Sequence, residues 1–220
     1  MISSIDILYR YLNFVKKTMP YIVGIAGGSA SGKTTFITKL KKHYHNGQLC
    51  IISQDHYYKA LSEQTVDENG NVNFDLPDGI DFRRLVKDIN KLKAGKDAKI
   101  VEYTFNNPQK FPKTITFEPA PIIIIEGLFI YTDAKLSKLF DLKLFIDAEM
   151  DVMLERRLQR DTKERAYSED QIRYQWDFHV KPSYDKYLLP YRNEVDLVIV
   201  NNKSFKRGLE VLKNHLDQFV

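Results

Sequence analysis

A-G-G-S-A-S-G-K-T-T, residues 26–35, is the stretch that decides the fold, and it directly follows the apolar run 21–25. It matches the phosphate-binding pattern G-x-x-x-x-G-K-[ST], which begins at Gly27 and ends at Thr34. Glycine lacks a Cβ, so the backbone N–H groups of such a loop can converge on a phosphate, and the following helix adds unpaired donors. We therefore expect a strand, a phosphate-binding loop (P-loop) and a helix, in this order. The alternative is a plain glycine-rich turn between strand and helix.

The loop predicts a nucleotide site that includes a metal ion. Lys33 would neutralise the β and γ phosphates, and the Thr34 hydroxyl would bind Mg²⁺. The residues expected to hold the nucleotide are Gly27, Gly28, Ser29, Ala30, Ser31, Gly32, Lys33, Thr34 and Thr35.

Length and composition favour one cytoplasmic α/β domain. The 220 residues suit a single domain with a sizeable core. The formal net charge is +4 with both signs interspersed, so no nucleic-acid-binding tail is expected. The single cysteine, Cys50, excludes a disulfide framework and a multi-cysteine metal site, which fits a reducing cytoplasm.

The N-terminal residues predict a helix rather than a signal peptide or a membrane span, because Asp6 and Arg10 interrupt their hydrophobicity. Apolar residues recur at helical spacing over residues 5–15. We expect residues 1–19 to form an amphipathic helical extension and residues 20–220 to form the main domain. The extension would pack on that domain or on a second subunit, with membrane-surface contact as the alternative.

Strand and helix patterns alternate along the rest of the chain. Four consecutive isoleucines, Ile122–Ile125, predict a strand buried on both faces of a parallel sheet. Further strands are expected at 49–53, 142–146 and 196–200, helices at 33–44, 82–92, from 149 onward and at 205–219, and an antiparallel excursion at 100–105 and 114–117. This order predicts an α/β fold with a parallel sheet flanked by helices.

Three acidic residues follow expected strands at the edge where ligands collect in such sheets. Asp147, after the strand at 142–146, is expected to be structural, as the N-cap of the helix that runs from Glu149. Glu126 ends the isoleucine strand and would either hold Mg²⁺ opposite Thr34 or cap the next segment. Asp55 follows the strand at 49–53 and would either accept the proton of an attacking hydroxyl or serve as a structural turn residue.

The stretch E-R-R-L-Q-R-D-T-K-E-R, residues 155–165, is dense in charge. Arg157 and Arg160 lie three residues apart on a helix, so both can point at one target. Residues 161–164 have no helical apolar spacing, which predicts a mobile loop. Arginines beside such a loop would form a lid over transferring phosphates; the alternative is a solvated cationic face.

Together these pieces resemble the uridine kinase (uridine–cytidine kinase) family, of the phosphoribulokinase/uridine kinase group of P-loop kinases. The resemblance covers about residues 21–200 and is carried by G-G-S-A-S-G-K-T-T, S-Q-D-H-Y-Y-K, N-F-D-L-P-D, V-E-Y-T-F, I-I-I-I-E-G, R-R-L-Q-R-D and V-K-P, in family order. It implies a P-loop NTPase fold with a five-stranded parallel sheet, a β-hairpin extension and an arginine-rich lid near residues 155–168. It also implies ATP or GTP as phosphate donor, Mg²⁺, and a homo-oligomer, either a tetramer or a dimer.

The resemblance further implies roles for single residues. Asp55 would be the catalytic base, and Arg160 and Arg165 would be lid arginines that act together with Lys33. The implied substrate contacts are Asp75 for the ribose hydroxyls, Phe74, Tyr103 and Phe105 for the nucleoside pocket, and Arg157 and Gln175.

Two departures from the family pattern fall on base recognition. Pro108 lies at or near the position where members that prefer pyrimidine nucleosides carry a histidine, and Tyr167 replaces a further arginine of the lid. A site that hydrogen-bonds its substrate discriminates strongly, so these changes would loosen or redirect specificity.

The expected reaction is transfer of the γ-phosphate of ATP or GTP to the 5′-hydroxyl of a pyrimidine nucleoside, uridine or cytidine. One alternative keeps the chemistry with another acceptor, such as nicotinamide riboside. Another is a catalytically silent nucleotide-binding regulatory protein. A GTPase is not expected, because the chain has no N-K-x-D motif and its D-x-x-G, residues 67–70, follows no strand. Neither a nucleic acid nor a membrane is expected as a partner.

Overall fold

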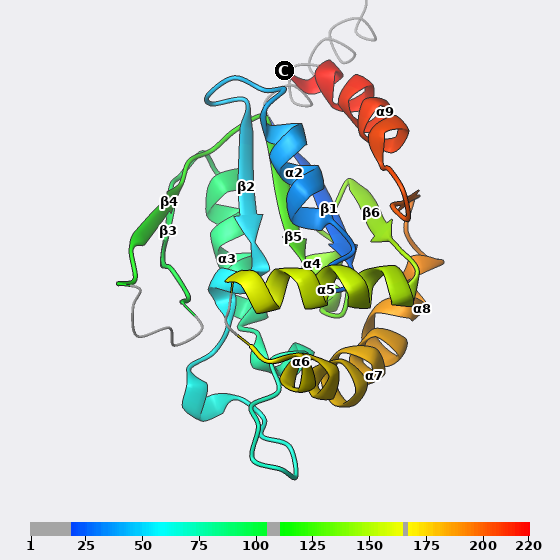
Figure 1. Cartoon of the computed structure of the whole chain (residues 1–220). Coiled ribbons are helices and arrows are strands. Elements are labelled where there is room, and N and C mark those ends of the chain that lie inside the picture. Colours follow the sequence, from blue (N-terminus) through cyan, green and yellow to red (C-terminus); the bar gives the residue numbers. More distant parts are fainter. Residues whose placement is uncertain (1–18, 105–110, 165–166) are drawn as a thin grey trace, which may run out of the picture.

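The computed structural model of the chain describes residues 19–104, 111–164 and 167–220. Its centre is a parallel sheet of five strands in the order β2–β5–β1–β6–β7 (Figure 1). The strands are β1 Tyr21–Gly27, β2 Leu49–Ser53, β5 Ile122–Gly127, β6 Leu142–Asp147 and β7 Leu197–Val200. The predicted parallel α/β sheet is confirmed, and each observed strand lies within one or two residues of its expected bounds.

The isoleucine strand β5 lies inside the sheet, between β1 and β2. Ile123 and Ile125 belong to the core on one face, whereas Ile122 and Ile124 belong to the core on the other. All four side chains are fully buried. Because successive side chains of a strand point to opposite faces, an uninterrupted apolar run requires cover on both sides, and the prediction of such a strand is confirmed.

Helices cover both faces of the sheet and give three layers. The helices are α2 Lys33–Lys41, α3 Phe82–Lys93, α4 Ala134–Ser137, α5 Met150–Glu164, α6 Glu169–Gln175, α7 Lys181–Ser183, α8 Leu189–Arg192 and α9 Lys206–Leu216. Apolar side chains of α2 and α9 share one core, and those of α3 and α4 share the other. The expected helices at 33–44 and 205–219 are shorter than predicted, and a 3-10 turn, Asp217–Phe219, follows α9. In the part of the chain that the structure describes, no helix is long and apolar enough to cross a bilayer.

The segment from α6 to α8 is helical almost throughout, although its sequence pattern predicted no helix there. Two π-helical turns, Trp176–Val180 and Tyr184–Leu188, separate α6, α7 and α8. Pro182 and Pro190 each follow a π-helical turn by two residues. Proline lacks an N–H and so interrupts the series of hydrogen bonds along an α-helix. The wider π-helical turns change the spacing of these hydrogen bonds just before each proline.

A separate two-stranded antiparallel sheet is formed by β3 Ala98–Val101 and β4 Thr114–Phe117. The antiparallel excursion is thus confirmed, but its first strand is two residues earlier and shorter than the expected 100–105. One backbone bond continues the pairing past β3, from the Glu102 N–H to the Lys113 carbonyl at 2.8 Å. Phe105 and Pro108, on which predictions about the base pocket rest, lie outside the described residues, as do Arg165 and the expected N-terminal helix.

Candidate active site

The P-loop connects β1 to α2, and its backbone is shaped for an anion. Ala30 and Gly32 adopt left-handed conformations with φ of 61° and 101°. Gly32 precedes α2 without a side-chain cap, so within the described residues the first N–H donors of the helix are left for a ligand. Left-handed residues beside a helix N-terminus turn successive N–H groups towards one point, which suits a phosphate. The nine residues predicted to hold the nucleotide run from Gly27, the last residue of β1, through this loop to the first turn of α2.

The Lys33 ammonium lies over the loop itself. Its Nζ donates hydrogen bonds to the carbonyl oxygens of Gly27 at 2.7 Å and Gly28 at 3.1 Å. These contacts place a cation beside the converging N–H groups, where the negative charge of a phosphate would be stabilised.

Four charged residues from separate segments lie within electrostatic reach of Lys33. Burial lowers the pKa of the Lys33 ammonium, whereas the carboxylates of Glu126, Asp55 and Asp75 raise it and Arg160 lowers it further. The fold therefore gathers the predicted phosphate, metal, base and ribose residues around one side chain.

Glu126 and Asp55 are held at the carboxyl ends of β5 and β2 by Ser53. In the sheet register Ser53 lies opposite Glu126, and its hydroxyl hydrogen-bonds the Glu126 carboxylate. The same hydroxyl accepts a bond from the Asp55 N–H at 3.3 Å. Asp55 is exposed at this edge and is the second residue of the 3-10 turn Gln54–Tyr57. Sequence reasoning missed Ser53, although it is the last residue of β2 and lies at the same edge of the sheet as the two acids.

The donor set at this edge fits a magnesium ion. Burial raises the pKa of Glu126 and the Asp55 carboxylate raises it further, so two carboxylates lie close enough to repel each other. A divalent cation would offset this repulsion, and Mg²⁺ prefers oxygen ligands and is commonly bound by one or two carboxylates together with substrate phosphates. Thr34 offers an exposed hydroxyl at the start of α2. Among residues 19–104, 111–164 and 167–220 no group of three or more His, Cys, Asp or Glu forms a metal site.

Glu126→Gln is expected to stabilise the metal-free protein at neutral pH. An acid whose pKa is raised on folding binds more protons in the folded state than in the unfolded state. Its contribution to stability therefore falls as the pH rises above 4.5, the ordinary pKa of a glutamate side chain. Glutamine does not ionise, so the variant should unfold at a higher Tm than the wild type at neutral pH, and the difference should shrink towards pH 4.5. Thermal unfolding in a chelator across this pH range measures the difference, and one that stayed constant would contradict the prediction.

Arg157 links three elements around the P-loop. Its guanidinium donates to the Ser29 hydroxyl at 3.0 Å and to Oε1 of Gln175, at the end of α6, at 2.8 Å. The third contact is the buried ion pair with Asp161, at 3.3 Å from Nε to Oδ2. Arg157 therefore connects the P-loop to α5 and α6, and two of the predicted substrate contacts, Arg157 and Gln175, bind each other.

Asp161 holds both predicted arginines in place, and sequence reasoning missed it. Its carboxylate is fully buried and also pairs with Arg160, at 2.7 Å from Nε to Oδ1. The expectation of a loop at 161–164 was wrong, because α5 continues to Glu164. The apolar periodicity that predicts helices cannot detect a helical position that is buried by an ion pair instead of an apolar side chain. Arg157 and Arg160 thus share one carboxylate, and the prediction that they act together on transferred phosphates stays a prediction.

Three aromatic rings form a cluster near the acidic edge. The Tyr58 ring packs edge-on against Phe74, with centroids 5.6 Å apart, and lies 5.5 Å from Tyr103. The Tyr58 hydroxyl also donates to the Phe74 carbonyl at 2.9 Å. Asp75 directly follows Phe74, and its N–H bonds the Asn73 side chain at 2.9 Å. The structure thus brings Phe74 and Tyr103 together; their role in binding a nucleoside stays a prediction.

Asn201, directly after β7, fixes the P-loop from the other side. Its buried side-chain amide donates a hydrogen bond to the Ser31 carbonyl at 2.8 Å, and its main-chain carbonyl accepts one from the Arg156 guanidinium at 2.8 Å. A Cβ on Gly32 would collide with the Asn201 amide. Sequence reasoning missed this residue, although a polar side chain directly after a parallel strand is the signal that identified Asp55.

Gly32→Ala is expected to abolish measurable ATP binding. The left-handed backbone opposes any Cβ, and the collision with Asn201 would force the loop to move. Gly47→Ala is the matched control, because Gly47 has φ of 82° and open space around it. The control should lose only about 1 kcal/mol of unfolding free energy and bind ATP normally. Equal ATP affinities of the two variants, measured by calorimetry, would refute the role assigned to Gly32.

Comparisons with known proteins agree with this geometry. Residues 22–205 match the model of the Phosphoribulokinase / Uridine kinase family. Uridine-cytidine kinase B of Dictyostelium discoideum is 32% identical over 197 residues, which cover 90% of this chain and 81% of that protein. Uridine kinase of Staphylococcus aureus (strain JH9) is 33% identical over 199 residues, which cover 90% of this chain and 96% of that protein. The solved phosphoribulokinase from Rhodobacter spheroides has a similar fold, with a TM-score of 0.59 at 15% identity over 86% of this chain and 74% of that one.

Proposed function

Because the chain belongs to the phosphoribulokinase/uridine kinase family, we propose that it transfers the γ-phosphate of ATP or GTP to the 5′-hydroxyl of uridine or cytidine. The products would be UMP and CMP, which makes this a reaction of pyrimidine salvage. The observation that supports the proposal best is the set of charged residues around Lys33, because it combines a phosphate-binding cation with the acids Asp55 and Glu126 and with Arg160.

Catalysis would consist of positioning and charge stabilisation. The P-loop N–H groups and Lys33 would hold the donor phosphates, and Arg157 and Arg160 would stabilise charge on the transferred group. Asp55 is exposed at the acidic edge and would accept the proton of the nucleoside hydroxyl. Mg²⁺, held by Thr34 and Glu126 when bound, would neutralise charge on the donor phosphates.

The nucleoside would lie beside the aromatic cluster. Asp75 would accept hydrogen bonds from the ribose hydroxyls, and Phe74 and Tyr103 would contact the base or the sugar. Phe105 is proposed for the same pocket and Arg165 for the lid, on the family resemblance alone.

A substrate panel tests the proposal. Purified protein is assayed for nucleoside-dependent formation of ADP from Mg-ATP, and in parallel of GDP from Mg-GTP, against uridine, cytidine, adenosine, guanosine and nicotinamide riboside. We expect the highest kcat/KM with uridine or cytidine. Activity only with another riboside would keep the chemistry and refute the acceptor, whereas neither ADP nor GDP with any acceptor would refute the kinase proposal in favour of a silent nucleotide-binding protein.

A further inference from the structure

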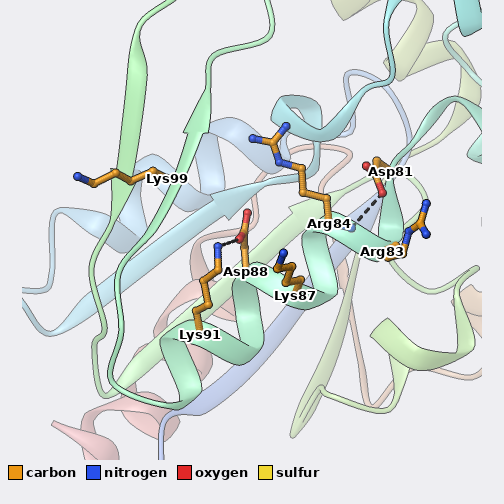
Figure 2. A pocket seen from close by; sticks show the side chains of 7 residues that line it. All are labelled: Asp81, Arg83, Arg84, Lys87, Asp88, Lys91 and Lys99. Atoms are coloured by element: carbon orange, nitrogen blue, oxygen red, sulfur yellow. Dashed lines mark hydrogen bonds and ion pairs between the residues drawn. The ribbon is translucent and has the colours of Figure 1, made fainter.

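A basic pocket lies on the outer side of α3, at its boundary with β3 (Figure 2). Its volume is about 470 Å³. Five of its seven lining residues are cationic: Arg83, Arg84, Lys87, Lys91 and Lys99. None of these residues belongs to the proposed active site.

The two acids of the pocket do not neutralise this charge. Asp81 caps α3, with its carboxylate accepting a hydrogen bond from the backbone N–H of Arg84 at 3.0 Å. Asp88 is buried and pairs with Lys91 at 2.6 Å. In the part of the chain that the structure describes, Arg84, Lys87 and Lys99 take part in no ion pair. The pocket therefore carries an uncompensated positive charge.

The spacing of the cations indicates the size of the ligand. Arg84, Lys87 and Lys91 are three and four residues apart on α3, so they form one stripe about 10 Å long. Lys99 belongs to the neighbouring strand β3. We propose that this pocket is a regulatory site for a small anion with adjacent linked phosphate groups, distinct from the P-loop.

A chain of contacts connects this pocket to Asp55. The Asp88 carboxylate that binds Lys91 also accepts a hydrogen bond from the Tyr57 hydroxyl at 3.3 Å. Tyr57 is buried and ends the 3-10 turn Gln54–Tyr57, which contains Asp55. An adjoining pocket of about 320 Å³ shares Asp81, Arg83 and Arg84 and is lined by residues 56–60 of this turn and its continuation.

Phosphates in the pocket would compete with Asp88 for the Lys91 ammonium. The buried Asp88 carboxylate would then lack its cation, which is unfavourable, and its contact with Tyr57 would change. Occupancy of the pocket therefore shifts the turn that positions Asp55 and lowers kcat.

Inorganic tripolyphosphate is the probe for the test. Calorimetry is performed on the full chain with the P-loop saturated by a non-hydrolysable ATP analogue at constant free Mg²⁺. We expect one equivalent of tripolyphosphate to bind, with an affinity that falls as salt rises. The double variant R84A/K99A should bind tripolyphosphate at least about ten-fold more weakly than the wild type, since it loses two charge-assisted contacts and keeps the Asp88–Lys91 pair.

The matched control is K203A/R207A, which removes two exposed cations elsewhere on the surface. It should bind tripolyphosphate as the wild type does. Turnover is measured with saturating ATP and nucleoside, so that competition at the P-loop is removed; tripolyphosphate should lower kcat of the wild type and the control, and not that of R84A/K99A.

Three outcomes would overturn the proposal. One is that no tripolyphosphate binds once the P-loop is saturated. Another is that R84A/K99A and K203A/R207A weaken tripolyphosphate binding equally, which indicates a diffuse cationic surface. The third is tighter binding of a short DNA duplex than of tripolyphosphate, which indicates a nucleic-acid surface. Binding that leaves kcat unchanged would refute the connection through Asp88 and Tyr57. If no kinase activity is found, calorimetry still decides whether the site exists.

Discussion

Asp55→Asn is expected to lower kcat about 10³-fold, because an amide cannot accept the proton that would leave the nucleoside hydroxyl if Asp55 is the base. The carboxylate is exposed at the edge of the sheet and within electrostatic reach of Lys33, and its N–H is tied to Ser53. Asparagine keeps the size and the backbone bond, so KM for the nucleoside should change by less than about three-fold, as expected for a group that acts in the transition state. Steady-state kinetics with Mg-ATP measures both constants.

A second readout tests the electrostatic contact between Asp55 and Glu126, and a control variant tests whether the loss of kcat is specific to Asp55. Asp55 raises the pKa of Glu126, so the variant should bring this pKa down and extend Mg²⁺-dependent nucleotide binding to lower pH. Asp97→Asn, at an exposed position after α3, is the control and should leave kcat unchanged. If Asp55→Asn left turnover as it is, the base would have to be assigned to another residue.

Asp161→Asn is expected to destabilise the protein by about 3–5 kcal/mol, the cost of breaking a buried ion pair from one side. Asp161 is fully buried, and the Arg157 side chain is only 7% exposed. The variant leaves this guanidinium without its anion and removes the contact that holds Arg160. Chemical denaturation measures the loss, and kcat/KM should fall as well, because Arg157 also contacts Ser29 of the P-loop.

Asp151→Asn, on the exposed side of the same helix, is the control and should change the unfolding free energy by less than about 0.5 kcal/mol. Similar losses in both variants would mean that any acid on α5 contributes to stability. A stable Asp161→Asn variant with normal kinetics would mean that the two arginines keep their positions without this carboxylate.

The parts of the fold that sequence predicted are those governed by local rules. The P-loop pattern and the four isoleucines of β5 each determine a backbone conformation or a burial pattern directly, and both predictions are confirmed. The end of α5 and the segment from α6 to α8 were not predicted. Asp161 is buried and pairs with two arginines of its own helix, and π-helical turns follow no 3.6-residue period, so apolar spacing detects neither.

In the candidate active site, too, residues marked by a local pattern were predicted, and residues that act through tertiary contacts were not. Asp55 and Glu126 were found because acids after parallel strands are informative in themselves. Asn201 and Ser53 act by contacts with segments that lie far along the chain or across the sheet, and a single sequence does not reveal such pairs. The contacts of Arg157 with Ser29 and Gln175 belong to the same class.

The bond between Asn201 and the Ser31 carbonyl joins residues 170 positions apart. During synthesis the P-loop leaves the ribosome well before the residue that fixes it, which is made 170 positions later. The central strand β1 also waits for both of its neighbours, β5 and β6, whose paired residues lie about a hundred positions further on. We therefore expect the apolar residues of β1 to lack their strand neighbours while about a hundred further residues are made, and a nascent chain that ends before Asn201 has the P-loop sequence without the side chain that fixes it.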